Sequence, residues 1–496
     1  MHIAQVHTLA PDGISAVPVT IEVAARPGLS ALTIVGLPGR AVAESKERIR
    51  LALRSLGVTL PATNIVINLV PASLRKDGTH YDLPIALALL IAIGYIPQNA
   101  IPKNTVVFGE LGLDGVVHSV ANAAVLAHYA WMHHMACVVP KGNVATLSVL
   151  EGLKFSSVAT LAECVDRARS FKWTKNYGSS PQTIAKPNHD VTLDDIVGQQ
   201  IAKRAVVIAA AGAHALYMTG PPGVGKTVLA KAAHALCPPL TVAEQREVTV
   251  MYSAAGLVSD SMPLVTHPPW RSPHHSVSVR ALTGTVNGKP GETALAHRGV
   301  LFLDEMTYFS SAALESLREP LQSGRVHISD VGKGVLWPTR FTCIAASNPC
   351  DCGYLGDTTK QCTCTPTQIQ RYQRRISGPI RNRFALQIWC ARPSASSVDF
   401  GSHAHWRDRV ATARQRQCMR QGETNGWVSD QTVRTYMKQC GLDSVILDMV
   451  DMYGYTMRGA MHIARVAMTI ADLENTAVKQ CHIEEATVMV PKGLVI

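Results

Sequence analysis

Apolar residues recur along the first third of the chain with two different periods. Residues 41–56 place apolar side chains at helical spacing opposite a charged face, whereas residues 19–24, 31–35 and 64–70 run or alternate as strands do. The same patterns predict a further strand over 106–113, a buried helix over 83–93 and another helix over 120–132. Interleaved strands and helices of this kind predict a mixed α/β domain over residues 1–171.

The rest of the chain divides into three parts by the same criterion. Residues 172–190 are polar, contain Pro, Gly and Ser, and show no periodicity, which is typical of a linker. Residues 191–392 return to buried strands followed by helices, and residues 393–496 show helical periodicity. We therefore predict an α/β core over 191–392 and a helical domain over 393–496.

The core contains a phosphate-binding loop pattern, G-x-x-x-x-G-K-[ST]. An apolar run over 213–219 precedes the pattern, and a helical segment over 228–236 follows it. In this context the backbone N–H groups turn toward phosphate oxygens at a helix N-terminus, the lysine reaches the β- and γ-phosphates, and the hydroxyl binds Mg²⁺. The residues predicted to hold the nucleotide are Gly220, Pro221, Pro222, Gly223, Val224, Gly225, Lys226, Thr227 and Val228.

A second segment, residues 299–305, has the pattern of a buried strand that ends in two carboxylates. Downstream of a phosphate loop, Asp304 is expected to hold Mg²⁺ and Glu305 to orient and deprotonate the attacking water. The two segments together predict that the chain binds and hydrolyses a nucleoside triphosphate. In this prediction Lys226 and Glu305 are catalytic, and Thr227 and Asp304 are the Mg²⁺ ligands.

Charge narrows the class of partner. The chain has a formal net charge of +11. Residues 1–171 carry 13 basic and 11 acidic side chains and residues 393–496 carry 11 of each, so the excess lies between 172 and 392. This excess favours an anionic partner. Because no signal-peptide pattern is visible and the longest apolar stretch, 83–96, is too short to span a bilayer, we expect a cytoplasmic protein with no membrane partner.

Four of the 12 cysteines lie close together, in two C-x-C pairs separated by a short loop. Four thiols at this spacing in a cytoplasmic protein favour a metal over disulfides, and four thiolates suit tetrahedral Zn²⁺. The alternative is four reduced cysteines in a loop. We predict a structural zinc site within 350–364, with ligands Cys350, Cys352, Cys362 and Cys364.

Two segments of the N-terminal domain resemble the Lon-protease-type domain of the ribosomal-S5-domain-2-like fold. They are RKDGTHYDLP at 75–84 and FGELGLDG at 108–115. The protease has a serine after the first segment and a lysine after the second, but this chain has no serine within 75–118 and no lysine within 115–140. His80 stands near the serine position, and a histidine without a matching base is no nucleophilic constellation. The resemblance therefore implies an α+β scaffold or assembly module that lacks the Ser/Lys dyad and peptidase activity.

The core resembles AAA+ ATPases in more than its phosphate loop. Residues 193–200 are similar to the segment that precedes the loop in that class, and Asn348 follows an apolar strand pattern over 341–346. This is the sensor-1 position, where a polar side chain contacts the γ-phosphate or holds the lytic water.

Two further positions resemble the arginines of that class. Arg383 stands where the class carries an arginine finger, which reaches a neighbour's nucleotide and so implies a ring. Arg381 is a rival, because Asn382 replaces the Asp that usually precedes the finger. Arg458, at the start of a long helical pattern, matches the sensor-2 arginine of the lid. We count Asn348, Arg383 and Arg458 with the catalytic residues.

Over its full length the chain resembles the magnesium-chelatase-like ATPases of the ComM/YifB type. The segments that carry this resemblance are RSPHH at 271–275, GETALAHRG at 291–299, NPCDCGYLGD at 348–357 and RVAMTIADL at 465–473. The resemblance implies an AAA+ P-loop core with a helical C-terminal lid behind a Lon-protease-like domain, and ATP and Mg²⁺ as cofactors. It also implies a hexameric, ATP-driven DNA helicase that promotes branch migration in natural transformation.

Two turns are candidates for DNA contacts. Lys289 lies in a glycine-rich turn over 283–291, and Lys333 lies in a strand-turn-strand pattern over 325–339. Hairpins at these two places line the pore in helicase-like members of the class, and a lysine there offers any phosphate a sequence-independent contact. The alternative is a solvated lysine at a hairpin tip.

A second function stays open at this point: a chelatase-type remodelling ATPase that acts on a protein client. The same core serves both functions. Stimulation of ATP turnover by DNA, and its steep loss with rising salt, separates them.

Overall fold

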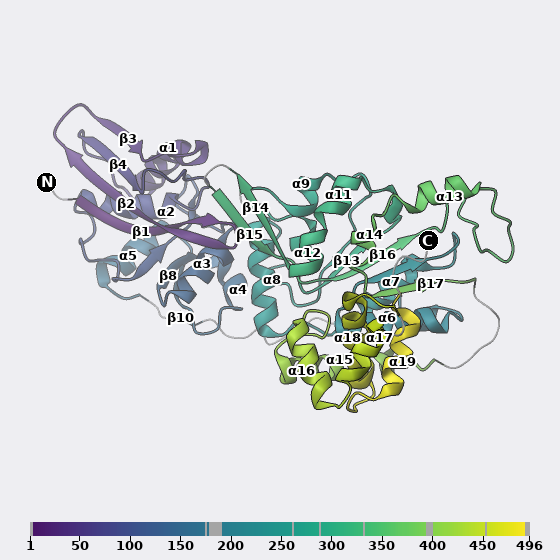
Figure 1. Ribbon diagram of the computed structural model, residues 1–496. Helices are drawn as coiled ribbons and strands as arrows, with labels where there is room; N and C mark the ends of the chain where they lie inside the picture. Colours follow the sequence, from purple (N-terminus) through teal and green to yellow (C-terminus); the bar gives the residue numbers. More distant parts are fainter. Residues whose placement is uncertain are drawn as a thin grey trace. The chain divides into compact units, whose positions relative to one another are not determined.

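The computed structural model describes residues 3–173, 176–177, 191–259, 262–286, 289–330, 333–392, 400–451 and 454–491 (Figure 1). The chain forms two compact units. Most of the predicted linker lies outside the described residues. The first unit comprises Met1–Ile184, Thr241–Val265 and Asn287–Lys289, and the second comprises Ala185–Leu240, Thr266–Val286 and Pro290–Ile496.

The first unit contains a four-stranded sheet in the order β1-β2-β4-β3. Its two long N-terminal strands pair antiparallel, and β3 pairs parallel with β4. Side chains alternate between buried and exposed along β1 and β4, and the buried set shares one hydrophobic core with helices α1 and α2. The bounds are β1 (Ile3–Asp12), β2 (Ser15–Arg26), β3 (Ala31–Val35), α1 (Arg40–Ser55), β4 (Asn64–Val70) and α2 (Asp82–Ala92).

A second sheet of the first unit corrects one prediction. The single strand expected over 106–113 is two short strands, because the chain forms β5 (Thr105–Val107), leaves that sheet, and then forms β6 (Glu110–Leu111) of another. The N–H of Gly109 donates to His80 O and its carbonyl accepts from Leu83 N, at 3.0 Å each, so its backbone pairs with the chain before α2. The remaining elements are β6 (Glu110–Leu111), β7 (Val117–His118), α3 (Ala123–Met132), β8 (Ala136–Pro140), η1 (Lys141–Asn143), α4 (Val144–Leu147), β9 (Lys154–Val158), α5 (Leu161–Ser170) and β10 (Asn176–Tyr177).

Helix α8 (Val242–Ala254) belongs to the first unit although the sequence places it inside the ATPase core. It packs on α3, where Val250 and Val125 are buried together. Ser253 Oγ donates to Ala121 O at 2.7 Å, and the Arg246 guanidinium lies 4.4 Å from the Trp131 ring centroid. The first unit is therefore discontinuous in sequence.

The second unit contains a five-stranded sheet in the order β12-β13-β16-β11-β17. All neighbouring strands are parallel, and β13 and β16 are buried along their whole length, as expected for a sheet covered on both faces. The order places the phosphate-loop strand β11 beside β16 and separates it from β13. The bounds are β11 (Leu216–Thr219), β12 (Trp270–Arg271), β13 (Val300–Leu303), β16 (Thr342–Ser347) and β17 (Leu386–Trp389).

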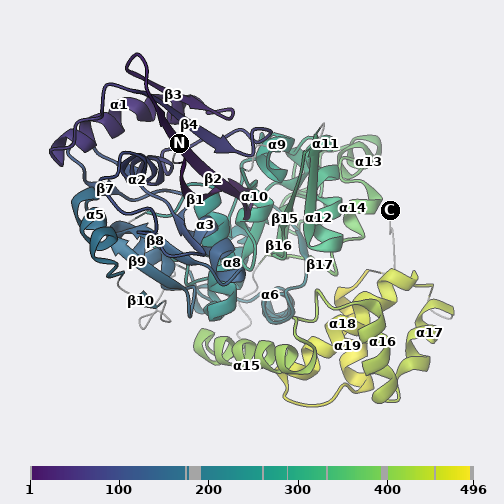
Figure 2. The same cartoon turned by 90° about the vertical axis from the view of Figure 1, so that its left-hand side faces the viewer.

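In the described part of the C-terminal region, residues 400–451 and 454–491, the predicted helices are α15 to α19 (Figure 2). Helices α15 and α18 contact α6, and buried residues of all three share a core with the central sheet. Each of α15, α16 and α18 begins at a serine or threonine whose hydroxyl accepts an N–H of the first turn. The bounds are α6 (Gln200–Gly212), α15 (His403–Gln421), α16 (Asp430–Gln439), α17 (Asp443–Asp451), α18 (Met457–Leu473) and α19 (Gln480–Met489).

The strand-turn-strand pattern predicted over 325–339 is a hairpin of β14 (Arg325–Asp330) and β15 (Lys333–Pro338). Among the helices in the described ranges, none has the length and apolar content needed to cross a bilayer. The other elements of the second unit are η2 (Leu193–Asp195), α7 (Lys226–Ala235), α9 (Val279–Thr283), α10 (Glu292–Leu295), η3 (Met306–Tyr308), α11 (Ser311–Ser316), α12 (Arg318–Ser323), α13 (Pro366–Gln373) and α14 (Gly378–Arg381).

Candidate nucleotide-binding site and cysteine cluster

The predicted phosphate loop joins the end of β11 to the N-terminus of α7. Gly223 and Gly225 have φ of +78° and +87°, a region that side-chain-bearing residues rarely adopt, while nothing lies within 4 Å of an added Cβ. At Gly220 the reason for a glycine is steric and not conformational, because a Cβ there would lie 2.2 Å from Cys390 O. These glycines let the backbone turn tightly before the helix, which leaves the first N–H groups of α7 available to an anion.

Lys226 is folded back over this loop. Its Nζ donates to Gly220 O at 2.6 Å, to Pro221 O at 2.9 Å and to Asn348 Oδ1 at 3.1 Å. Burial lowers the pKa of its ammonium group. The structure thus brings Lys226 together with the predicted sensor residue at the tip of β16, although 122 positions separate them in sequence.

Thr227 and Asp304 also meet. Thr227 Oγ1 donates to Asp304 Oδ2 at 3.0 Å, and the Glu305 N–H donates to Asp304 Oδ1 at 3.0 Å. A hydroxyl and a carboxylate in contact beside a phosphate loop are the oxygen ligands that Mg²⁺ takes together with substrate phosphates. The residues present therefore fit the ion.

Glu305 lies at the exposed end of β13. Its φ of 50° and ψ of 47° place it in the left-handed region, which is uncommon for a residue with a side chain. This conformation turns the chain out of the strand into η3, so the carboxylate projects from the sheet edge instead of continuing into the core. Such a position suits a group that must face water and a phosphate.

The three candidate arginines lie in two different surroundings. Arg381 lines a pocket of 280 Å³ together with Asn348 and donates to Gln373 O at 3.1 Å. Arg383 donates to Gln322 Oε1 at 2.5 Å, but its buried Nε and Nη1 have no hydrogen-bond partner among the residues that the structure describes.

Arg458 is exposed in the first turn of α18. Burial lowers the pKa of Arg383, and the charges of Arg458 and Arg318 lower it further, so these three cations lie near one another. Within the described chain, no hydrogen bond or ion pair joins Arg383 or Arg458 to the phosphate loop. The structure therefore groups the two predicted arginines with each other and not with Lys226.

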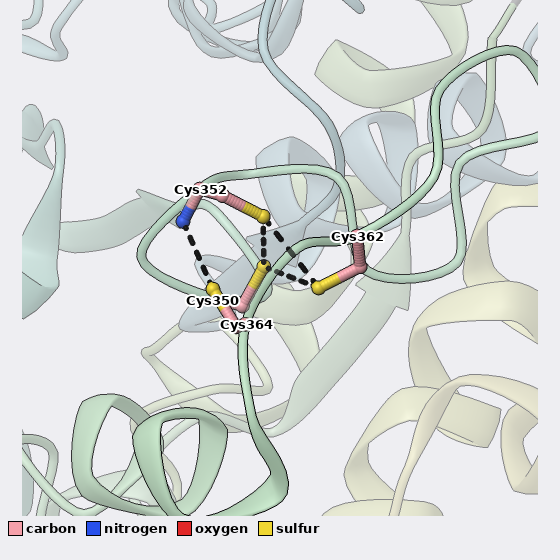
Figure 3. Close-up of side chains that lie close together, drawn as sticks. All are labelled: Cys350, Cys352, Cys362 and Cys364. Atoms are coloured by element: carbon pink, nitrogen blue, oxygen red, sulfur yellow. Dashed lines mark hydrogen bonds between the residues drawn. The ribbon is translucent and has the colours of Figure 1, made fainter.

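The four clustered cysteines converge on one point (Figure 3). Their Sγ atoms all lie within 4.8 Å of one another, and Cys350, Cys352 and Cys362 are separated by 3.3, 3.5 and 3.6 Å. These distances exceed a disulfide bond of about 2.05 Å and are close to the ~3.8 Å edge of a tetrahedron with Zn–S bonds of about 2.3 Å. Backbone N–H groups of Tyr354 and Thr363 lower the pKa of Cys352 to about 5, which favours the thiolate. The donor set fits a tetrahedral thiophilic ion.

His80 in the first unit is buried, and its Nε2 lies 3.0 Å from Leu9 O. Burial lowers the pKa of His80 to about 4. The side chain is therefore a neutral core residue bonded to backbone, which agrees with the expectation that no nucleophilic pair occupies this position.

Of the two lysines predicted to contact DNA, the structure describes the side chain of Lys289 but not that of Lys333. Lys289 is exposed beside a bridge between Gly284 and Pro290. Lys333 is the first residue of β15, opposite Asp330, and its side chain lies outside the described part of the structure.

Aromatic and cationic side chains surround Tyr308, which lies three residues after Glu305 in the sequence. No role for this group was predicted from the sequence. Tyr308 is 42% exposed and lies near His275 and Tyr372, with ring centroids 6.1 and 6.4 Å away. The Arg375 guanidinium lies 5.7 Å from the Tyr308 centroid, and the rings of His274 and His275 are 4.0 Å apart. The RSPHH segment was the available signal, but nothing in it indicated which side chains it would meet.

Three exposed arginines, Arg371, Arg374 and Arg375, lie on α13 and just after it, and Arg375 lies over the rings of Tyr308 and the buried Tyr372. In the described part of the chain, no carboxylate lies within ion-pair distance of any of the three. The arginine–aromatic surface, defined as His274, His275, Tyr308 and these three arginines, therefore presents unpaired positive charge beside the exposed rings of His274 and Tyr308.

Comparison with known proteins finds the magnesium chelatase family along the chain. Residues 192–398 match "Magnesium chelatase, subunit ChlI", residues 21–143 match "Subunit ChlI of Mg-chelatase", and residues 401–489 match "Magnesium chelatase, subunit ChlI C-terminal".

Among curated relatives, the protein YifB of Escherichia coli strain K12, described as uncharacterized, is 36% identical over 98% of this chain and 96% of its own. The competence protein ComM of Haemophilus influenzae is 34% identical over 98% of this chain and 97% of its own. The magnesium-chelatase 38 kDa subunit of Cereibacter sphaeroides is 28% identical over 31% of this chain and 51% of its own.

Proposed function

This chain belongs to the magnesium-chelatase-like family that includes YifB and ComM, and we propose that it is an AAA+ ATPase that couples ATP hydrolysis to movement on DNA. The observation that carries the ATPase part is the contact set of Lys226, Asn348, Thr227 and Asp304 around one phosphate loop. The relation to ComM, a competence protein, over 97% of its length supports a role in competence. In this proposal the role is branch migration of DNA during natural transformation, which the resemblance to ComM-type ATPases implies.

The roles in hydrolysis follow from this geometry. Lys226 would exchange its loop carbonyls for the β- and γ-phosphate oxygens, while Thr227 and Asp304 would hold Mg²⁺, which would offset the phosphate charge. Asn348, already bonded to Lys226, contacts the γ-phosphate or the lytic water. Glu305 accepts the proton of that water from its exposed position at the sheet edge.

We place the remaining catalytic groups in a neighbouring subunit. Arg383 and Arg458 lie near each other, and neither is bonded to the phosphate loop of its own chain within the described residues. Two buried N–H groups of Arg383 without a partner suit an incoming anion, because an unpaired buried donor is costly. A γ-phosphate presented by an adjacent subunit satisfies them, which supports a ring homo-oligomer, specifically a hexamer.

The arginine–aromatic surface supports DNA as the partner. Unpaired arginines attract backbone phosphates, and the exposed rings of Tyr308 and His274 can stack with bases of a single strand without selecting the sequence. Lys289 and Lys333 are additional candidate contacts. Tyr308 of this surface lies three residues after Glu305 in the sequence. A contact of DNA with Tyr308 would therefore be made three residues from the catalytic carboxylate.

Two finer parts of the proposal concern the remaining features. The four cysteines hold a structural Zn²⁺. The first unit is a Lon-protease-like scaffold without peptidase activity, and its buried His80 at the serine position supports this assignment.

The test is ATP-dependent migration of a synthetic branched DNA junction, with Lys226→Ala and Glu305→Gln variants alongside. Strand movement by the wild type and by neither variant is the expected result. Robust ATP turnover with no movement and no stimulation by DNA at low salt would overturn the DNA part. That result would favour the alternative, a chelatase-type remodelling ATPase with a protein client.

A further inference from the structure

The loop that carries the four cysteines, residues 350–364, begins two positions after Asn348 at the tip of β16. Cys350 and Cys352 lie at its start and Cys362 and Cys364 at its end (Figure 3). An ion bound to all four therefore closes the loop at its base. This loop is called the metal loop below.

The metal loop lies against the phosphate loop. A Cβ added to Gly353 would lie 3.0 Å from Pro222 Cδ and 3.4 Å from Pro222 Cγ, so Gly353 faces the Pro222 ring with no room for a side chain between them. Gly353 has φ of +85°, and its N–H donates to Cys350 O at 3.0 Å. The turn that brings the first cysteine pair together thus also contacts the third residue of the phosphate loop.

The far side of the metal loop is fixed to β17, which neighbours the phosphate-loop strand β11. A Cβ added to Gly356 would lie 3.1 Å from Trp389 Cζ2. The Asp357 carboxylate accepts from Arg392 Nη2 at 2.8 Å and from Arg392 Nε at 3.0 and 3.1 Å. The metal loop therefore contacts the phosphate loop through Gly353 and strand β17 through Gly356.

Without a metal, few interactions hold the two cysteine pairs of this loop together. Within the described residues the loop from Cys350 to Cys364 contains no helix or strand, and the sulfur atoms of Cys350, Cys352 and Cys362 face one another at 3.3 to 3.6 Å. One backbone hydrogen bond, from the Cys352 N–H to Cys364 Sγ at 3.4 Å, joins the two cysteine pairs. A bound divalent ion would displace the thiol protons and form four metal–sulfur bonds, and its binding energy would then become folding energy of the loop.

We infer that the four-thiolate metal site positions the phosphate loop through the contact between Gly353 and Pro222, so that the metal and the nucleotide bind cooperatively. This inference rests on the proposed nucleotide site and not on movement along DNA. Coupling between two sites in a protein is typically worth a factor of roughly 5 to 150 in affinity, and it acts equally in both directions.

The first experiment removes the metal. The full-length double variant Cys362→Ser/Cys364→Ser is compared with wild type and with Cys481→Ser, an exposed cysteine outside the cluster. Zinc per chain is measured by mass spectrometry, and affinity for a fluorescent ADP analogue by titration. We expect about one zinc per chain in the wild type and the control. The double variant is expected to lose the zinc and to bind the analogue at least 5-fold more weakly.

The second experiment keeps the metal and breaks the contact, which covers the case in which the cysteine variant misfolds. Gly353→Ala pushes a methyl group onto Pro222, whereas Gly422→Ala imposes a similar backbone strain, at φ of +75°, with nothing within 4 Å of the added carbon. We expect both variants to retain zinc and only Gly353→Ala to lose affinity for the analogue.

Equal affinity of Gly353→Ala and Gly422→Ala for the analogue would overturn the inference, as would purified wild-type protein without metal. Unchanged nucleotide affinity in a folded double variant that has lost its zinc would do the same. A wild type that fails to bind the analogue at all would instead overturn the proposed ATPase function. The reciprocal effect is a slower release of zinc to a chelating dye when the analogue is bound.

Discussion

The arginine–aromatic surface makes a quantitative prediction about salt. Replacing Arg371, Arg374 and Arg375 together by glutamine removes three exposed charges that have no carboxylate partner among the described residues, so folding stability is expected to change little. Each phosphate contact contributes roughly 0.7 to the slope of log affinity against log salt for a single strand. If all three arginines contact phosphates, the slope falls by about 2, and the wild type loses roughly 15- to 20-fold more affinity than the variant between 50 and 200 mM salt.

The assay is fluorescence anisotropy of a labelled single strand at several salt concentrations, with the nucleotide held constant. A charge-matched control replaces Arg407, Arg434 and Lys438 of the helical domain by glutamine, because all three are exposed there. The control is expected to keep the wild-type slope. An unchanged slope in the Arg371/Arg374/Arg375 variant would refute the assignment. Loss of the oligomer in light scattering would refute it as well, since the surface would then be a contact between subunits.

Three further predictions concern the nucleotide site and the buried histidines. Lys226→Ala should abolish binding of a fluorescent ATP analogue, whereas Glu305→Gln should bind it and release phosphate about 10²- to 10⁴-fold more slowly; equal loss of binding in both would contradict the assigned roles. Arg383→Ala subunits should regain ATP turnover when mixed with Lys226→Ala subunits, because each supplies what the other lacks; no regain on mixing would place Arg383 in its own subunit's site. Burial lowers the pKa of His80 to about 4 and that of His214 to about 3. As the pH decreases from 6.5 to 4, the unfolded chain therefore binds more protons than the folded chain, and the free energy of unfolding decreases. The decrease is up to about 3 kcal/mol for His80. Urea titrations at pH 7 and pH 5 measure that fall, and His80→Gln and His214→Gln should each reduce it.

Local sequence predicted the parts of the site that depend on neighbouring residues. The phosphate loop, its strand and its helix occur where the pattern placed them, because backbone conformation there is set by glycines within eight positions. The cysteine cluster was predicted for the same reason, since C-x-C spacing brings two thiols together in any turn. The assignment of Asn348 to the sensor-1 position followed only from the resemblance to a known class, and its contact with Lys226, 122 positions away, was not predicted because no local signal reports it.

The parts that the sequence did not predict depend on contacts between distant segments. The apolar positions of α8 indicate a buried face but not its partner, and the helix packs on α3 of the first unit. The strand expected over 106–113 has the right composition throughout, yet the backbone of Gly109 pairs with residues near α2. The contact between Gly353 and the Pro222 ring joins segments 131 positions apart, and a glycine has no side chain whose pattern could predict it.

The discontinuity of the first unit has a consequence for the order in which the protein is made. Domains fold largely as they leave the ribosome, from the N-terminus onward. The first unit, however, lacks α8 until residues 241–265 have been synthesised, and by then the phosphate loop and α7 have already emerged. Until that point α8 does not yet cover the apolar side of α3 that Val250 contacts. A fragment that starts after residue 190 would carry α8 without its partner helix, and a fragment that ends at residue 184 would expose α3, so the N-terminal unit cannot be removed by a single cut.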